Sequence, residues 1–286
     1  MPVAVEQPPP MLAIQAPAHR PTAAPITHLS WSSLQDYSMC PRKFFFRRVA
    51  CVAEERRSSS LVFGGSIHRA VELAHEARIA GGKLPSPKSL LAAYEGAWRG
   101  ELSQGPEVVY PKGDTQDSLR DTASRMLMAY RKHYKHDRGK VIAIEHEATL
   151  SLTPESIPLK ARIDLVTVEG QNLIVSDLKT SKSRWSDSKV AESLPQLVIY
   201  SAATTGLARE LGLRRIVPRF VILTKAKEPV IQTIDPQASQ ADVVRLRELV
   251  SETARAIRSE VFPRREGWQC AQCPYSGRCL GNGRGQ

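Results

Sequence analysis

The clearest alternation of apolar and polar side chains lies in the middle of the chain. Leu159–Val168 alternates in this way and is rich in β-branched residues, and Asn172–Lys179 is a similar run. Gly170-Gln171 between them suits a two-residue hairpin loop, because glycine supplies the positive φ that such loops require. A four-residue loop over Glu169–Asn172 would keep the same register. The pattern therefore predicts an antiparallel β-hairpin.

Helical periodicity dominates the segments on both sides of this hairpin. A serine cap at Ser30 predicts a short helix that ends near Cys40-Pro41. Apolar residues recurring every three or four positions predict further helices at Gly64–Ala80, Pro87–Leu102, Asp117–His136, Leu194–Leu211 and Gln240–Glu260. Additional strands are expected at Val141–Leu152, Ile216–Thr224 and Pro229–Ile234. Helices mixed with strands indicate an α/β fold, with a helical insertion over about 83–138 before the sheet.

Composition narrows the class of protein. The 286 residues can form one substantial core, and 42% apolar and 24% charged residues are ordinary for a globular protein. The net charge of +11, from 40 basic and 29 acidic residues, favours a polyanionic partner such as nucleic acid, although it also serves solubility. Residues 1–27 contain seven prolines and are expected to be a disordered tail.

Several features are missing from the sequence. There is no run of 18 apolar residues, and the first residues lack the apolar core of a secretory signal, so we expect a cytoplasmic protein without membrane contact. Five cysteines, an odd number, do not indicate a disulfide framework. Neither a phosphate-binding P-loop nor a G-x-S-x-G motif is present, so the chain carries no P-loop motor and no acyl-transfer motif of that kind.

The predicted hairpin brings two carboxylates together. Its register places Asp164 directly across from Asp177, roughly 5 Å away, and Lys179 projects from the same face. Facing like charges destabilise a sheet, so something must offset the repulsion. The offset could be a salt bridge to Arg162 or Lys179, or exposure to solvent. It could instead be a divalent cation held by Asp164 and Asp177, with Lys179 beside the attacking water.

These residues resemble a known nuclease signature. Asp164 followed by Asp177-Leu178-Lys179 is similar to the D…(D/E)xK pattern of the PD-(D/E)xK nuclease superfamily. The sequence DLKT at 177–180, followed by Gln196-x3-Tyr200, resembles its RecB-type branch in particular. The similarity extends from about Ser30 to Leu280. Two positions depart from the pattern without removing a functional group: Ile163 replaces the proline of the superfamily name, and Ala161 stands where glycine is common.

The resemblance implies roles for individual residues. His68, in the segment Phe63–His68, would be a third metal ligand on an upstream helix. Alone, it would more often be structural, as we expect for His75 seven residues on. The ligands of Mg²⁺ or Mn²⁺ would be His68, Asp164, Asp177 and the carbonyl of Leu178. Lys179 would orient the water, and Gln196 and Tyr200 would position the DNA.

A second metal site is indicated near the C-terminus. Cys270-x2-Cys273-x5-Cys279 offers three closely spaced thiolates, a strong metal signal, and Cys40 is the expected fourth ligand. The arrangement resembles nucleases of the same branch that carry a [4Fe–4S] cluster, and a structural zinc ion is the alternative. Either group would tie residues 263–286 to the N-terminal segment. Cys51 is expected to be a small buried apolar residue.

Three basic segments have two interpretations each. Arg42–Arg48 mixes bases with three phenylalanines and either contacts nucleic acid or packs its rings in the core. Arg131–His136 is either a solvated last helical turn or the lining of a DNA channel. Lys182, Arg184 and Lys189 make the loop after the hairpin basic, a plausible place for phosphate contacts.

Taken together, the residues and the resemblance predict a restriction-endonuclease-like fold, with a mixed central sheet flanked by helices over 28–262 and a cysteine-cluster module. The expected function is a metal-dependent DNA nuclease, exonucleolytic on single-stranded or frayed ends, in DNA repair, recombination or defence. One alternative is a nuclease that trims CRISPR spacer precursors. Another is a non-catalytic DNA-binding subunit of a helicase-nuclease complex. A separate helicase or CRISPR-associated protein would be the partner.

Overall fold

A computed structural model of the chain describes residues 26–135, 139–152 and 156–281. The predicted disordered tail, 1–27, lies outside the described residues except for its last two positions. Within the described ranges, every helix is too short or too polar to span a bilayer.

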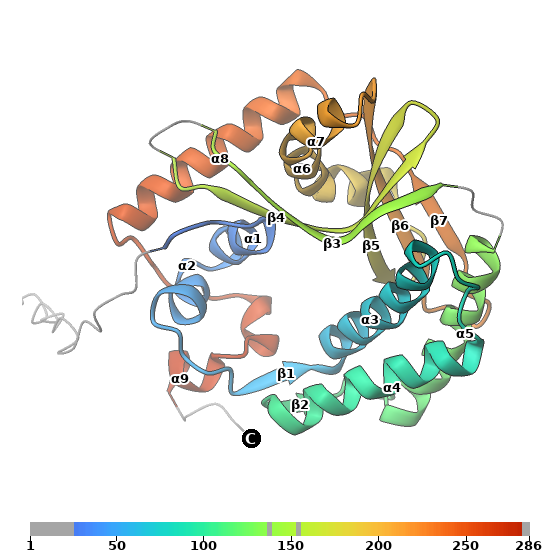
Figure 1. The fold of residues 1–286 in the computed structure, drawn as a ribbon. Coiled ribbons are helices and arrows are strands. Elements are labelled where there is room, and N and C mark those ends of the chain that lie inside the picture. The colour runs from blue at the N-terminus through green and yellow to red at the C-terminus, as the bar shows by residue number, and fades with distance from the viewer. Residues whose placement is uncertain (1–25, 136–138, 153–155, 282–286) are drawn as a thin grey trace, which may run out of the picture.

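A mixed sheet of five strands forms the centre of the molecule (Figure 1). Its order is β3-β4-β5-β6-β7, and all neighbours are antiparallel except β5 and β6, which are parallel. The strands run over Lys140–Leu150 (β3), Leu159–Glu169 (β4), Asn172–Ser181 (β5), Arg215–Thr224 (β6) and Ile231–Ile234 (β7). The predicted strands are thus confirmed, with ends shifted by one or two residues. The mixed α/β sheet flanked by helices is confirmed as well.

The hairpin of β4 and β5 has the predicted register but a shorter ladder. Gly170 takes a φ of 60° in the two-residue turn, and pairing runs from Glu169–Asn172 to Leu165–Ser176. It stops there, so the predicted direct pairing of Asp164 with Asp177 is wrong. The physical reason is competition between neighbours, because β4 continues along β3 while β5 continues along β6. The two strands fork where the two aspartates begin.

Helices cover both faces of the sheet. One core cluster joins the sheet to α1 (Trp31–Met39), α6 (Asp187–Ala203) and α8 (Gln240–Arg258). A second cluster joins the other face to α3 (Ser59–Ile79), α4 (Pro87–Gln104) and α5 (Gln116–Tyr134). Figure 1 shows the two groups on opposite sides of the strands. The helices of the expected insertion, α4 and α5, therefore complete the core on the side of α3.

Two helices differ from the predicted boundaries. The α3 helix begins five residues earlier than expected, because the Ser58 side chain accepts a hydrogen bond from the Ser60 N–H and caps it. The predicted helix at 194–211 is two helices, α6 and α7 (Thr205–Glu210). The α6 helix starts at Asp187 because Ser186 caps it. It ends at the C-cap Thr204, whose hydroxyl donates a hydrogen bond to the Tyr200 carbonyl.

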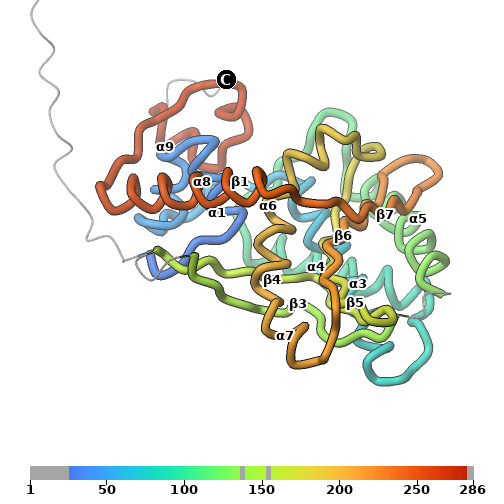
Figure 2. The backbone as a smooth tube through the Cα atoms, turned by 90° about the horizontal axis from the view of Figure 1, so that it is seen from above, coloured from blue at the N-terminus to red at the C-terminus, as the bar shows by residue number. Residues whose placement is uncertain are grey.

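The two ends of the described chain pack together. Figures 1 and 2 show the C-terminal helices beside the first helices of the chain. The N-terminal part of this region contains α2 (Pro41–Phe44) and a π-helix (Phe45–Val49). The C-terminal part contains a 3-10 helix (Trp268–Gln272) and α9 (Ser276–Leu280). Two short parallel strands, β1 (Arg56–Ser58) and β2 (Glu107–Val109), lie next to it. Side-chain bonds from Arg56 to the Ala271 carbonyl and the Ser276 hydroxyl link the two ends.

The aromatic segment Arg42–Arg48 packs in the core instead of forming an open basic surface. Phe44 is fully buried and stacks on Phe262 at a centroid distance of 6.2 Å. Arg47 is held by Asp36 at 2.7 Å and by Glu54 at 2.5 Å. Of the two interpretations, the structure favours core packing.

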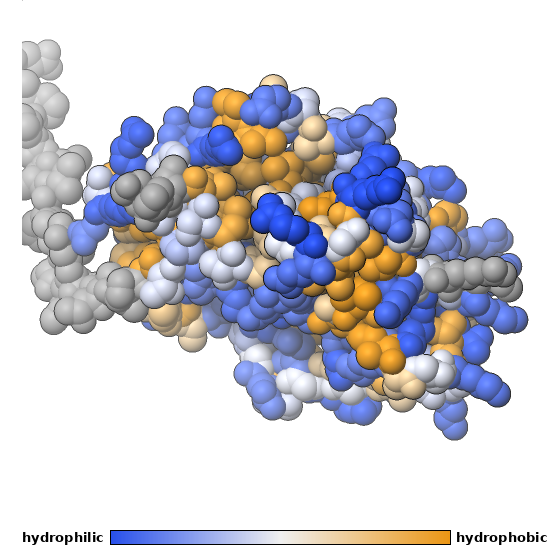
Figure 3. Space-filling model, turned by 45° about the horizontal axis from the view of Figure 1, so that its top comes forward, coloured by the Kyte–Doolittle hydropathy of each residue, from blue (hydrophilic) through white to orange (hydrophobic). Residues whose placement is uncertain are grey.

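Cys51 contradicts the expectation of burial. It is exposed and has a φ of 46°, two residues after the π-helix ends at Val49. Figure 3 shows one face of the molecule, on which hydrophilic side chains surround several apolar patches. Exposed apolar residues such as Leu211, Val244 and Val261 are single side chains of the kind common on protein surfaces.

Candidate active site

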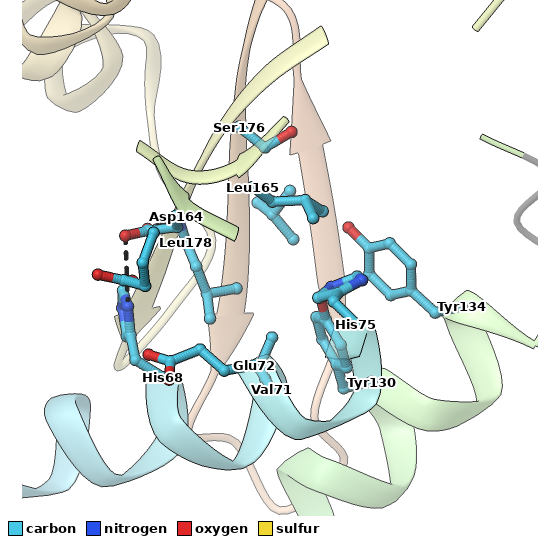
Figure 4. Close-up of a pocket in the computed structure, with 12 residues that line it drawn as sticks. His68, Val71, Glu72, His75, Tyr130, Tyr134, Asp164, Leu165, Ser176 and Leu178 are labelled. Atoms are coloured by element: carbon cyan, nitrogen blue, oxygen red, sulfur yellow. Dashed lines mark hydrogen bonds and ion pairs between the residues drawn. The ribbon is translucent and has the colours of Figure 1, made fainter. Parts of the chain in front are cut away.

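The candidate site lies where β4 and β5 fork. Asp164 Oδ2 accepts a 2.6 Å hydrogen bond from the backbone N–H of Leu178, which bridges the opening between the strands. The other oxygen, Oδ1, lies 3.6 Å from His68 Nδ1 on α3. Figure 4 shows His68 reaching from the helix toward Asp164. The predicted proximity of His68 to Asp164 is therefore present in the structure.

Glu145 is a third member of this group that sequence reasoning missed. One ligand atom each from His68, Glu145 and Asp164 lies within 4.8 Å of the others. Glu145 stands between the pairs Ile144–Leu165 and His146–Ile163, and so faces Asp164 across β3 and β4. A correct register of β3 on β4 would have revealed it. That register is shifted by an irregularity between Val141 and Ala143, which the alternation of residues does not reveal.

Asp177 is held from three directions. Its side chain is 1% exposed, Lys179 Nζ lies 2.6 Å from Oδ2, and Gln196 Nε2 donates to Oδ1 at 2.6 Å. The Tyr200 hydroxyl donates to the Arg162 carbonyl at 2.7 Å and lies 3.3 Å from the same Oδ1. The structure thus places Gln196 and Tyr200 as groups that fix Asp177. Their expected role in positioning DNA stays a prediction.

The charges of the two aspartates are offset by different groups. Lys179 neutralises Asp177, as one of the sequence interpretations expected, while His68 and the Leu178 amide face Asp164. Arg162 pairs instead with Glu145 at 2.8 Å. Asp177 lies outside the close group of three candidate ligand atoms, which His68, Glu145 and Asp164 provide.

The pKa values of the titratable groups at this site shift in different directions. Burial alone would lower the pKa of His68 and raise that of Asp164, but their mutual attraction reverses both shifts. Burial raises the pKa of Glu145, and the charge of Asp164 raises it further. Burial also raises the pKa of Asp177, against the opposing effect of Lys179. His68 and Asp164 thus stabilise each other's charge, whereas burial disfavours the charged forms of Glu145 and Asp177.

The space beside these groups fits a small ligand. A cavity of about 20 Å³ adjoins His68, Glu72, Glu145 and Asp164, which is enough for one water-sized group. An imidazole nitrogen with carboxylate oxygens is a donor set suited to Mn²⁺, and carboxylates and water suit Mg²⁺. The residues present therefore fit a divalent cation.

A family profile decides the identity of the chain. The PD-(D/E)XK nuclease superfamily matches residues 28–280. The chain belongs to this superfamily. The nuclease is therefore a hydrolase, and nucleic acid is its substrate class. No curated protein matches its sequence.

A solved structure has the same fold at low sequence identity. The nuclease resembles a crystal structure described as "Putative exonuclease" from Eubacterium rectale, with 11% identity, a TM-score of 0.52, and coverage of 91% of this chain and 89% of the other. A second structure, of the protein SSO0001, has 15% identity, a TM-score of 0.32 and coverage of 78% and 85%. Of these two likenesses, the first supports the fold, and the second is too weak to do so.

His75 of the nuclease is structural, as predicted. It is 1% exposed, and its Nε2 lies 2.6 Å from the Tyr130 hydroxyl. Figure 4 shows it with Tyr130 and Tyr134 at the end of the cavity away from Asp164. Tyr134 is also buried, so the basic segment at the end of α5 contributes packing as well as charge.

The four predicted cysteine ligands of the nuclease line one cavity. Cys40, Cys270, Cys273 and Cys279 surround a space of about 330 Å³. Burial raises the pKa of Cys273 and Cys279, and the nearby Cys40 thiol raises both further. Among the described residues, no three of these sulfur atoms lie within 4.8 Å of one another. The four cysteines thus line the same cavity without forming a compact group of sulfur atoms.

Proposed function

We propose that this chain is a metal-dependent DNA exonuclease that acts on single-stranded or frayed ends in DNA repair, recombination or defence. The observation that carries the proposal is the group His68, Glu145 and Asp164 beside the Asp177–Lys179 pair. The fold likeness to a protein described as an exonuclease supports the exonucleolytic part. A complete set of charged groups argues against a non-catalytic DNA-binding subunit.

Each residue of the site has a distinct proposed role. His68, Glu145 and Asp164 would hold Mg²⁺ or Mn²⁺, with Asp177 and the Leu178 carbonyl completing the site. The bound ion lowers the pKa of a water ligand and neutralises charge that develops on the phosphate. Lys179 would orient the attacking water with its ammonium group. Gln196 and Tyr200 keep Asp177 in place by the hydrogen bonds described above.

One assay tests this function directly. End-labelled single- and double-stranded DNA would be incubated with the protein and Mg²⁺, Mn²⁺ or EDTA, and the products resolved on a gel. We expect mononucleotides or short products that depend on the metal and on a free end, and no cleavage by Asp164→Asn. Cleavage that persists in EDTA, or equal activity of Asp164→Asn, would contradict the assignment. Cutting of circular single strands would contradict the exonucleolytic part alone.

Metal binding can be measured without activity. A ligand that binds only the folded state stabilises it by about 2.7 kcal/mol at one hundred times its Kd. We therefore expect Mn²⁺ to raise the melting temperature of the wild-type protein, and much less that of Asp164→Asn. Equal shifts in both proteins would place the ion elsewhere.

We also propose that the four cysteines hold a [4Fe–4S] cluster. Four thiolates around one zinc ion, each about 2.3 Å from it, would lie only about 3.8 Å apart. The size of the cavity that the four cysteines line supports a larger group. Its proposed role is to tie the two ends of the chain together.

A further inference from the structure

A lysine outside the signature motif lies beside the end of β5. Because β5 and β6 are parallel, their carboxyl ends meet at the same edge, with Ser181 opposite Thr224. The backbone N–H of Lys225 then donates to the Ser181 carbonyl at 2.7 Å. Lys225 therefore follows directly on the strand pair that carries Asp177 and Lys179.

The Lys225 side chain is a half-buried cation without a carboxylate partner. Its Nζ lies 4.2 Å from the centre of the Phe63 ring, which is fully buried on α3. No carboxylate of the described residues lies within ion-pairing distance of it. Burial lowers its pKa, Asp114 acts in the opposite direction from farther away, and the charge of Lys182 lowers it further. A cation–π contact alone compensates poorly for such desolvation, so the position favours an anionic ligand.

The α3 helix connects Lys225 to the metal donors. Phe63 contacts Lys225, and the neighbouring Gly64 faces the Thr180 hydroxyl of β5. His68 is four residues after Gly64, on the same helix face and about one turn, 5.4 Å, farther along the axis. Phe63, which makes the contact with Lys225, precedes His68 by five residues, or about 7.5 Å along the axis of α3.

Two glycines, Gly64 and Gly65, leave the surface of α3 next to Phe63 without side chains. A Cβ atom on Gly64 would meet only the Thr180 hydroxyl oxygen, at an ordinary 3.7 Å, and one on Gly65 would meet nothing within 4 Å. Neither has the positive φ that would require glycine. Glycine in a helix costs up to about 1 kcal/mol relative to alanine, so packing does not account for either residue. Their effect is to let a ligand approach the helix backbone closely.

We propose that Lys225 binds a backbone phosphate of the substrate strand next to the scissile one, and that the strand passes over Gly64 and Gly65. This inference rests on the proposed nuclease function. It adds to the signature residues a binding contact from the loop after β6, held in position by Phe63.

The test compares three variants in the Asp164→Asn background, with a labelled single-stranded oligonucleotide followed by fluorescence anisotropy. Lys225→Met keeps the side-chain length and the contact with Phe63, and Lys225→Arg keeps the charge. Lys227→Met is the matched control, because Lys227 is exposed in the same loop. We expect Lys225→Met to raise Kd roughly tenfold. The slope of log K against log salt should fall by about 0.7, the value for one phosphate contact on a single strand.

Lys225→Arg should keep the wild-type slope, and Lys227→Met should change Kd less than about twofold. With Asp164 restored, Lys225→Met should raise KM and leave kcat nearly unchanged. An unchanged Kd and slope in Lys225→Met would overturn the inference while leaving the nuclease function standing. Equal losses in Lys225→Met and Lys225→Arg with a lowered melting temperature would assign Lys225 to packing, which also overturns it. A wild-type protein that neither binds nor cuts DNA would overturn the proposed function, and this inference with it.

Discussion

Glu145 has a backbone conformation that a glutamate rarely adopts. Its φ of 49° lies in the left-handed region although the residue belongs to β3. A non-glycine residue in such a conformation costs about 1–3 kcal/mol, and it persists only where the surrounding structure enforces it. Here the conformation places the carboxylate beside Asp164 and His68, where it also pairs with Arg162. Strain at this position is consistent with a functional requirement.

Substitution of Glu145 separates stability from metal binding. Glu145→Gly should be more stable than Glu145→Ala by about 1 kcal/mol, because glycine adopts the positive φ without a Cβ clash. Both variants should lose metal affinity by at least about tenfold, because a ligand has been removed. Urea unfolding and Mn²⁺ titration measure the two effects. Alanine equal to glycine in stability would mean that the backbone at this position is unstrained.

Lys179 should matter for the reaction and little for binding. Its ammonium lies 2.6 Å from the buried Asp177, at the fork that holds the metal donors. Lys179→Ala should lower the cleavage rate by about 10²–10³-fold, the range seen when one electrostatic contact to a transition state is lost. DNA affinity should change little. Single-turnover cleavage and anisotropy provide the two readouts, with the exposed Lys227→Ala as control. A Lys179→Ala protein that cuts at the wild-type rate would exclude the assigned role.

At the scale of elements, the fork of β4 and β5 and the crossing of α3 create the site. Ile163 packs in the core cluster with α6, while Leu165 lines the cavity on the side of α3. The apolar alternation of β4 thus changes face at Asp164. The irregularity brings groups from both sides of the sheet to one opening.

Two glycines in these elements should respond to alanine in opposite directions. Gly65 is exposed in α3 and has open space around it, so Gly65→Ala should stabilise the protein by up to about 1 kcal/mol. Gly170 has a φ of 60° in the hairpin turn, so Gly170→Ala should destabilise it by about 1–2 kcal/mol. Thermal or chemical unfolding of both variants checks the signs. A destabilised Gly65→Ala would mean that α3 depends on that glycine for packing.

For the whole molecule, the arrangement of the chain ends suggests why a metal cluster would stabilise the fold. Glu55 accepts hydrogen bonds from the backbone of Gly277 and Arg278, and Arg56 binds the Cys273 carbonyl at the longer distance of 3.4 Å. They add to the Arg56 bonds and the Phe44–Phe262 stacking that also join the two ends. A group bound to Cys40 and the three C-terminal cysteines would close a loop of more than 200 residues, which removes several kcal/mol of chain entropy from the unfolded state.

Protein purified without oxygen should therefore be brown and contain iron and sulfide. Alanine at Cys40, Cys270, Cys273 or Cys279 should bleach it and lower its melting temperature, because the chain ends come loose. Cys51→Ala is the matched control and should do neither, since Cys51 is exposed and does not line the cavity. One equivalent of zinc without iron would overturn the iron–sulfur assignment and leave the structural role. A colourless, metal-free protein of unchanged stability would contradict both.

The overall charge predicts how binding depends on salt. A net charge of +11 favours phosphate contacts, and each contact releases counterions when it forms. DNA affinity should therefore fall steeply between 50 mM and 200 mM salt, by a factor of about 10³ or more if six or more phosphates are neutralised. Anisotropy titrations at several salt concentrations measure this slope. A nearly constant affinity would show that the positive charge serves another purpose.

Local pattern was sufficient for much of the fold and part of the site. Alternation and turn residues predicted the β4–β5 register between the pairs Leu165–Ser176 and Glu169–Asn172. In a half-buried hairpin, the polarity of each side chain indicates which face of the sheet it occupies. Helical periodicity located α3, which carries His68, and the paired aspartates with Lys179 indicated a charged site. Here the signals come from residues close together in sequence.

Only the tertiary structure decided the features that depend on competing surfaces. The β4–β5 ladder ends early because β4 continues to pair with β3 and β5 continues to pair with β6. Glu145 belongs to the site because of an irregularity in β3. Lys225 meets Phe63 only because β6 lies parallel to β5 beneath α3. Of these contacts, the one between Lys225 and Phe63 joins residues more than a hundred positions apart. Their geometry is determined by how packed elements share space, which no local periodicity records.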